Sequence, residues 1–303
     1  EVSAINMVYG AASTGKRVLT SSSSPGVSLM SEGFSYIAGA ELPCVVINVT
    51  RGGPGLGTIQ PSQSDYFQAT KGGAHGDFHL IVLAPNSVQE MHDFVFDAFD
   101  LAFKYRNPVM ILSDGVIGQM MEKVVLADQR PRRTAEEIIA QDGDWALTGK
   151  TADRKEHVIT SLELDPYAQE RFNEKLIAKY AKIRENEVRY EEFMTEMPDY
   201  IIVAFGSAAR ICRMTVEMAR EAGYKVGLVR PITFIRSVQG APRPRCKGGK
   251  GFPLAELNHG QMVEDVRLAV NGQAPVEHYG RSGGAVFSPD QVYEALLTKI
   301  INK

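Results

Sequence analysis

Short apolar runs alternate with amphipathic segments through the first 114 residues, and this alternation restricts the fold more than any other feature of the sequence. Three runs are almost continuously apolar: PCVVINVT at 43–50, HLIVLA at 79–84 and NPVMILSD at 107–114. Strands of this composition are buried on both faces, as in a sheet covered by helices. Strands that alternate with helices predict an α/β fold built on a parallel sheet.

Helices are predicted between these strands from residue periodicity and end signals. Residues 1–16 and 27–40 read as two helices, and Ser87 with Glu90 forms a capping box that begins a third. A short buried strand, RVLT at 17–20, is expected between the first two. Because a domain of this class normally opens with a strand, we expect the first domain to have a further segment upstream of residue 1.

Three regions are predicted along the chain. Residues 1–125 form the first domain, 126–197 a charged linker, and 198–303 a smaller α/β domain. In the linker, residues 170–194 read as a long amphipathic helix rich in Glu and Lys, which favours a solvent-exposed connector over a binding face.

The last region carries the pattern of a second α/β unit. Residues 200–205 are apolar, and Gly206 and Ser207 lead into a helical stretch at 208–222. Gly223 is a suitable stop for that helix, and KVGLVRPI at 225–232 reads as the next strand.

Composition argues against several classes of protein. The formal net charge is −3 without a basic stripe, which argues against a nucleic-acid partner. No apolar run approaches the roughly 20 residues that a membrane-spanning helix needs. Cys44, Cys212 and Cys246 are far apart, so neither a disulfide framework nor a metal or iron–sulfur site formed by this chain alone is expected. A soluble cytoplasmic protein is therefore expected.

A glycine-rich loop, RGGPGLG at 51–57, directly follows the strand at 43–50. Ligands of open α/β sheets bind beyond the carboxyl ends of the strands, and Arg51 lies at such an end. An arginine flanked by glycines suits bidentate binding of a carboxylate or phosphate. An alternative of equal weight is that Arg51 forms an ion pair with a neighbouring aspartate.

Several long motifs resemble one known family. EVSAINMVYGAA, NVTRGGPGLGTIQPSQSDYFQATKGGAHGDF and APNSVQEMHDFVFDAFDLAFKYRNPVMILSDG resemble the pyrimidine-binding domain of the α subunits of 2-oxoacid:ferredoxin oxidoreductases. GYKVGLVRPIT, ELNHGQMVEDVRLAVNG and HYGRSGG are similar to the transketolase-C-terminal-like domain of the same subunit. The glycine-rich motif looks most like the branched-chain, or 2-ketoisovalerate, type.

The resemblance implies roles for individual residues. In the family, the glutamate that begins the EVSAINM helix contacts N1′ of the thiamine diphosphate aminopyrimidine, and this position is Glu1 here. A carboxyl group at N1′ promotes the imino tautomer of the cofactor. The resemblance also implies that Ser24 and Gly26 bind the cofactor. The family arginine that meets the substrate carboxylate falls on Arg51. The loop is thus expected to hold a 2-oxo acid against thiamine diphosphate.

The same resemblance implies partners, because the chain has no motif for Mg²⁺ and diphosphate and no cysteine cluster. A β subunit is expected to hold the diphosphate, the Mg²⁺ and an iron–sulfur cluster. Subunits of the γ type and ferredoxin-like δ type are expected to complete a complex that uses a 2-oxo acid and CoA and reduces ferredoxin. A large apolar patch is expected to lie against the partner.

Substrate choice is expected to depend on the glycine-rich loop. Relatives with broad or 2-oxoglutarate specificity resemble RGGPST, whereas Gly55 and Leu56 follow the proline here. Leu56 is expected to make the pocket apolar and suited to a branched chain, unless it only packs under the loop. Open alternatives are 2-oxoglutarate or pyruvate as substrate, an E1-like thiamine enzyme that transfers its acyl group to a lipoyl carrier, and a non-catalytic scaffold subunit.

Residues 234–253, FIRSVQGAPRPRCKGGKGFP, depart from the family pattern. The stretch is basic and rich in glycine and proline, where relatives have an apolar start followed by a helix. We interpret it as a reading-frame slip in the source sequence in preference to a true loop.

Overall fold

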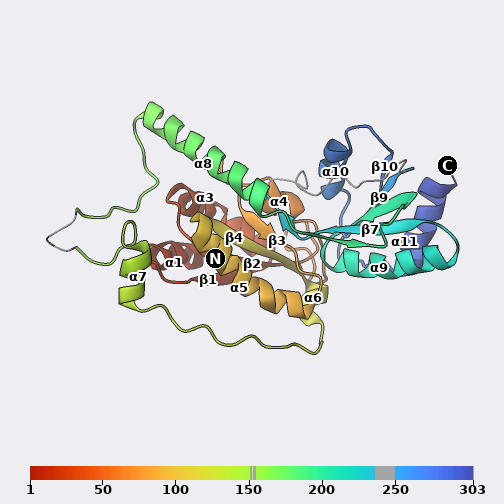
Figure 1. Ribbon diagram of the computed structural model, residues 1–303, viewed down its shortest axis with the longest axis horizontal. Coiled ribbons are helices and arrows are strands. Elements are labelled where there is room, and N and C mark those ends of the chain that lie inside the picture. Colours follow the sequence, from red (N-terminus) through yellow and green to blue (C-terminus); the bar gives the residue numbers. More distant parts are fainter. Residues whose placement is uncertain (151, 153–154, 236–249, 303) are drawn as a thin grey trace.

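The computed structural model describes residues 1–150, 152, 155–235 and 250–302, and it contains two α/β units side by side (Figure 1). The first unit is built on a five-stranded sheet in the order β1-β2-β4-β3-β8, and the second on a five-stranded sheet in the order β10-β9-β6-β7-β5. Neighbouring strands are parallel except for β8 beside β3 and β5 beside β7. The predicted α/β class is confirmed.

The strands of the first sheet are β1 (Leu19–Ser22), β2 (Cys44–Thr50), β4 (Pro108–Asp114), β3 (Ile81–Leu83) and β8 (Thr233–Phe234). Those of the second are β10 (Val276–Gly280), β9 (Phe252–Glu256), β6 (Tyr200–Val203), β7 (Val226–Pro231) and β5 (Tyr190–Phe193). The helices are α1 (Val2–Ala12), α2 (Pro25–Leu29), α3 (Ser31–Gly39), α4 (Tyr66–Thr70), α5 (Val88–Tyr105), α6 (Gly115–Gln119), α7 (Ala135–Asp142), α8 (Pro166–Asn186), α9 (Gly206–Glu221), α10 (Met262–Val270) and α11 (Pro289–Leu296), which continues as a π-helical turn (Leu297–Ile301).

Helices cover both faces of the first sheet, as its continuously apolar strands require. Alternate side chains of β2 and β4 pack with α1, α2 and α3 on one face and with α5 and α8 on the other. In the second unit, α9 and α11 pack on one face of the sheet. The opposite face, with α10, shares one continuous core with the first unit. In this core, Tyr66, Phe205 and Phe234 pack in edge-to-face and tilted pairs with ring centroids 5.3–5.7 Å apart. The two units are therefore joined by apolar packing.

Several local predictions need correction. β1 is an edge strand with exposed and half-buried side chains, not a buried strand, because only β2 pairs with it among the described strands. The helix expected at 27–40 is two helices that meet at Met30, and the first begins earlier, with Pro25 in its first turn, where proline is tolerated. The predicted helix stop at Gly223 is confirmed, since its φ is +87°.

The linker prediction is wrong in two respects. α8 ends at Asn186, and Tyr190–Phe193 form β5, antiparallel to β7. α8 is also more than a solvated connector, because Leu176, Tyr180 and Ile183, spaced by four and three residues, are buried in the core shared with α5. Most Glu and Lys residues of α8 are exposed, but the Lys179 side chain is 13% exposed and pairs with Glu41 of the first unit.

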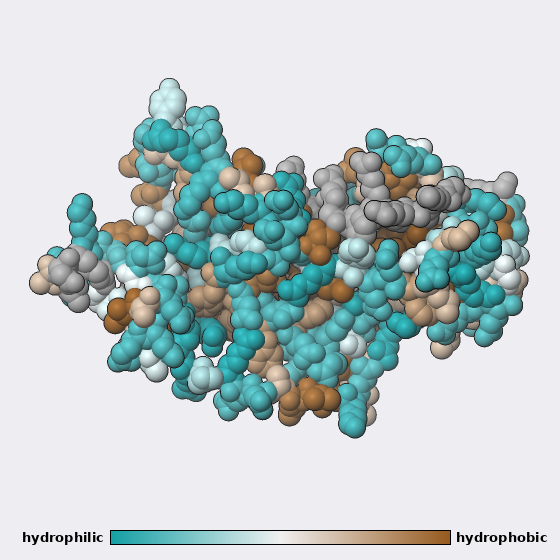
Figure 2. Space-filling view, in the orientation of Figure 1, coloured by the Kyte–Doolittle hydropathy of each residue, from teal (hydrophilic) through white to brown (hydrophobic). Residues whose placement is uncertain are grey.

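Apolar side chains are also exposed outside the sheets. They lie on the segments that flank α7 and lead into α8: Met121, Val125, Leu126, Val158, Leu162 and Leu164. The face in Figure 2 is otherwise mainly hydrophilic. None of the helices in the described ranges is both long and apolar enough to cross a lipid bilayer. The interpretation of residues 234–253 as a sequence error falls largely on residues 236–249, which lie outside the described residues.

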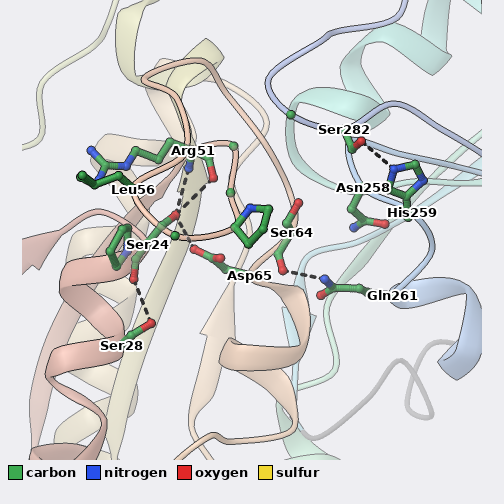
Figure 3. A pocket seen from close by; sticks show the side chains of 16 residues that line it. Ser24, Ser28, Arg51, Leu56, Ser64, Asp65, Asn258, His259, Gln261 and Ser282 are labelled. Carbon is green, nitrogen blue, oxygen red and sulfur yellow. Dashed lines mark hydrogen bonds between the residues drawn. The ribbon is translucent and has the colours of Figure 1, made fainter.

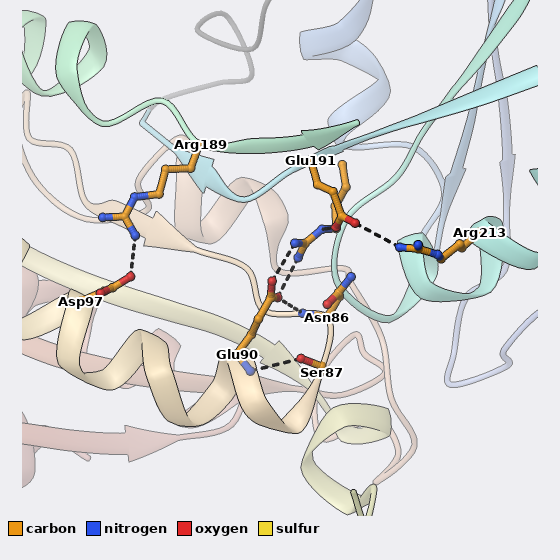
Figure 4. A network of polar contacts seen from close by, with 8 residues as sticks. Asn86, Ser87, Glu90, Asp97, Arg189, Glu191 and Arg213 are labelled. Carbon is orange, nitrogen blue, oxygen red and sulfur yellow. Dashed lines mark hydrogen bonds and ion pairs between the residues drawn. The ribbon is translucent and has the colours of Figure 1, made fainter. Parts of the chain in front are cut away.

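A buried arginine, Arg230, connects the two units through charge. Figure 4 shows its two partners, Glu90 on α5 and Glu191 on β5. The side chain of Arg230 on β7 is 3% exposed and donates two hydrogen bonds, of 2.7 and 2.8 Å, to the carboxylate of Glu90 on α5. Its Nε donates to Glu191 on β5 at 2.9 Å, and Glu191 accepts another bond from Arg213 on α9. Half of the predicted capping box is present: Ser87 accepts from the Glu90 N–H, but the Glu90 carboxylate faces Arg230 and the Asn86 N–H.

We predict that Glu90→Ala lowers the free energy of unfolding by about 2–4 kcal/mol, because it leaves the buried Arg230 guanidinium short of its bidentate partner. Asp100→Ala is the matched control, since its ion pair with Arg130 is exposed and contributes under about 1 kcal/mol. Urea denaturation measures both. Equal losses of stability in the two variants would contradict the importance of this contact.

Candidate functional site

A cleft of about 680 Å³ lies between the two units. One wall comes from the first unit: the start of α2, the glycine-rich loop 51–56, and Ser64 and Asp65. The other comes from the second unit: Asn258, His259, Gln261, Ser282 and Gly283. Figure 3 shows Ser24, Arg51 and Leu56 on one side and Asn258, His259 and Ser282 on the other. The cleft is within the range of roughly 300–1,000 Å³ that suits a small-molecule ligand.

Close backbone approach explains the glycines of the loop. Gly57 has a φ of +60°, and a Cβ there would lie 1.8 Å from the carbonyl oxygen of Gly52. A Cβ on Gly52 would lie 2.8 Å from the backbone of Gly283 and Gly284. The loop therefore folds tightly on itself and touches the loop of the second unit, and side chains at these positions would separate the two walls.

Arg51 begins the loop at the carboxyl end of β2, as predicted. Its Nε is buried and has no hydrogen-bond partner, and its guanidinium forms no ion pair within the described part of the chain. The alternative that Arg51 pairs with a neighbouring aspartate is therefore wrong, since Asp65 instead accepts hydrogen bonds from Ser24 and Asn48. An unpaired buried donor of a guanidinium is suited to an anionic ligand.

Polar contacts at the start of α2 hold the backbone of the loop. The Ser24 hydroxyl donates to Asp65 Oδ2 at 2.6 Å and accepts from the Arg51 N–H at 3.0 Å. The buried Asn48 side chain accepts from the Ser24 N–H at 3.0 Å and donates to Asp65 Oδ2 at 3.2 Å. Burial raises the pKa of the Asp65 carboxyl above its ordinary value, although these hydrogen bonds act in the opposite direction.

Glu1 and Gly26 lie together at the same end of the sheet. Glu1 Oε1 accepts a hydrogen bond of 3.0 Å from the Ser22 hydroxyl. A Cβ on Gly26 would lie 2.1 Å from that hydroxyl and 2.4 Å from Glu1 Oε1, so a larger residue would displace the carboxyl group. The Glu1 carboxyl itself fills this cradle of Ser22 and Gly26, and as an exposed acceptor it suits a ring nitrogen of a cofactor. Glu1 and Gly26 do not line the cleft, but Ser24 and Pro25, which directly precede Gly26, do.

Leu56 lines the cleft with its side chain 84% exposed. It therefore does not pack under the loop, which was the alternative to a role in the pocket. Its contribution to substrate choice stays a prediction.

The second wall was not predicted from the sequence. Asn258 is buried and donates to the backbone carbonyl of Gln63 at 2.9 Å, while His259 and Ser282 are hydrogen-bonded to each other at 2.7 Å. Their motifs, ELNHGQM and GRSGG, were recognised, but no local signal indicates that they face Arg51 across a cleft. Among residues 1–150, 152, 155–235 and 250–302, no group of three or more His, Cys, Asp or Glu side chains is arranged to hold a metal ion.

The chain is similar to known proteins over most of its length. A family model described as "Pyruvate flavodoxin/ferredoxin oxidoreductase, thiamine diP-bdg" matches residues 1–192, and one described as "Pyruvate:ferredoxin oxidoreductase core domain II" matches residues 198–292. Ketoisovalerate oxidoreductase subunit VorB of Methanothermobacter marburgensis is 50% identical, over 94% of this chain and 78% of that protein. The protein of the same name from Methanothermobacter thermautotrophicus is 47% identical, over 98% of this chain and 82% of that protein.

Among solved structures, a 2-oxoglutarate:ferredoxin oxidoreductase from Magnetococcus marinus with 2-oxoglutarate, coenzyme A and succinyl-CoA bound superimposes with a TM-score of 0.76 at 24% identity. The match covers 97% of this chain and 55% of that one, and at this identity it shows the fold alone. The family matches confirm the resemblance stated from the sequence, including a thiamine diphosphate-binding first domain. The chain belongs to the 2-oxoacid:ferredoxin oxidoreductase family.

Proposed function

We propose that this chain is the α subunit of an enzyme that oxidatively decarboxylates 2-ketoisovalerate, a branched-chain 2-oxo acid, to its acyl-CoA and reduces ferredoxin. The single observation that carries the proposal is the buried, unpaired Nε of Arg51 at the cleft between the two units. The two relatives named ketoisovalerate oxidoreductase subunits support the choice of acid.

Each site residue has a role in this proposal. Arg51 binds the substrate carboxylate, and the flanking glycines allow the acid to approach the backbone. Glu1, in the cradle formed with Ser22 and Gly26, holds a proton at N1′ of the thiamine diphosphate pyrimidine. When bound, that cofactor would supply a nucleophilic carbon for the 2-oxo group and a cationic ring that takes up the electrons released by decarboxylation. Leu56, at the rim, contacts the branched chain of the acid.

The rest of the machinery is assigned to partner subunits. We assign the diphosphate of the cofactor, Mg²⁺ and an iron–sulfur cluster to a β subunit, and the remaining electron transfer to γ and ferredoxin-like δ subunits. The relatives are themselves named as subunits, which supports a complex of several chains. The apolar side chains exposed near α7 and at the start of α8 suit contact with such a partner.

Replacing Arg51 tests the proposed function directly. In the assembled complex under anaerobic conditions, we expect Arg51→Ala to lower kcat/KM for 2-oxoisovalerate by about 10- to 100-fold, since a charge-assisted hydrogen bond contributes about 1.5–3 kcal/mol. CoA-dependent reduction of a low-potential viologen dye gives the rate. Arg171→Ala, at an exposed position on α8, is the control. Full activity in Arg51→Ala would favour the scaffold alternative. Transfer of the acyl group to a lipoyl carrier without CoA would favour the E1-like alternative.

A second variant tests substrate choice. We expect Leu56→Thr to lower the preference for 2-oxoisovalerate over 2-oxoglutarate by about 10-fold, because it exchanges an apolar contact for a hydroxyl. The preference is the ratio of the two kcat/KM values. Ile59→Thr is the matched control, since Ile59 belongs to the same loop region, is 78% exposed and does not line the cleft. An unchanged ratio in Leu56→Thr would contradict the role of Leu56.

A further inference from the structure

Asp65 is an acidic residue at a cleft that otherwise suits an anion. It lines the cleft, and no cation lies within ion-pair distance of it among the described residues. A half-buried carboxylate without a counter-ion is costly, and its charge opposes the binding of a carboxylate substrate. Direct contact with such a substrate is therefore a poor explanation for this residue.

The position of Asp65 in the fold makes its contacts more informative. Asp65 is the N-cap residue of α4, where an aspartate normally accepts a hydrogen bond from the backbone of the first helical turn. It makes no such bond, and the N–H of Phe67 is bonded instead by Gln261 of the second unit. The carboxylate is turned toward Ser24 and Asn48.

Ser24 transmits this contact to Arg51. Its single hydroxyl proton has two acceptors within reach, Asp65 Oδ2 at 2.6 Å and the Arg51 carbonyl at 3.4 Å, and the short bond to Asp65 is the stronger. The hydroxyl oxygen accepts the N–H of Arg51. Ser24 has a φ of +36°, a conformation that serine adopts rarely, and its N–H is held by Asn48. Beyond Arg51, the N–H of Gly52 donates to the Gln60 carbonyl, which fixes the other side of the turn.

We propose that Asp65 is a positioning residue for Arg51: acting through the Ser24 hydroxyl, it fixes the backbone from which the guanidinium reaches the substrate carboxylate. The inference rests on the proposed function, because it assigns Arg51 to the carboxylate of a 2-oxo acid. Since Arg51 Nε is enclosed, the backbone sets where the guanidinium lies, and a shift of the backbone moves the donor away from its ligand.

The test compares three variants of the assembled complex. We expect Asp65→Ala and Ser24→Ala each to raise KM for 2-oxoisovalerate by about 10-fold, the loss expected for one hydrogen bond. In Asp65→Ala, kcat and the KM for CoA stay nearly unchanged. The inhibition constant of isovalerate, a carboxylate that cannot react, rises by the same factor. Asp65→Asn restores the wild-type values, because an amide oxygen still accepts from Ser24. Asp77→Ala, in an exposed loop, is the control without effect.

Several outcomes decide the inference. A double variant, Ser24→Ala with Asp65→Ala, that is no worse than either single one supports a shared path to Arg51. An unchanged KM in Ser24→Ala overturns the inference, even where the Asp65→Ala complex fails to assemble. A fall in kcat in Asp65→Ala that Asp65→Asn does not restore overturns it in favour of direct participation of the carboxylate. A wild-type complex without activity overturns the proposed function and this inference with it.

Discussion

The hydrogen bonds of Gln63 join the two units, and the geometry of the cleft depends on them. Gln63 is 3% exposed, and all of its polar groups are bonded to the second unit. Its N–H donates to the Leu257 carbonyl at 3.0 Å, and its Oε1 accepts from the Leu257 N–H at 3.1 Å. Its Nε2 donates to the Phe205 carbonyl at 2.8 Å, and its own carbonyl accepts from Asn258. Buried groups of this kind are costly to leave unpaired, so the junction has one preferred geometry.

This junction brings together two loops that line the cleft and that come from different units. Ser62, next to Gln63, also donates to the Leu257 carbonyl, and Gln261 donates to the Ser64 carbonyl. The segment that closes the glycine-rich loop is therefore the same segment that holds Asn258 and Gln261 in place. Gly52 can then meet Gly283 backbone to backbone. The cleft and the contact between the units therefore share one set of residues.

Local sequence signals predicted the features that depend on residues close together in the chain. The apolar runs identified β2, β3 and β4, and the position of Arg51 at the end of β2 followed from the rule for open sheets. β5 was missed because YEEF has the same polar character as the preceding helix, and only pairing with β7 makes it a strand. The hydrogen bond between Ser24 and Arg51 joins residues 27 positions apart, and the one between Asn258 and Gln63 joins residues 195 positions apart. Such contacts leave no periodic signal in one sequence.

If the Gln63 junction sets the shape of both walls of the cleft, its loss loosens both walls, and hydrogen exchange measures this. In Gln63→Leu, which keeps the size but removes the side-chain bonds, amide protection is measured by mass spectrometry in the intact protein. We expect the loop 51–58 and the turn 257–261 to lose protection together, while β2 and β4 keep theirs. Unchanged protection in both loops, or loss in only one of them, would contradict it.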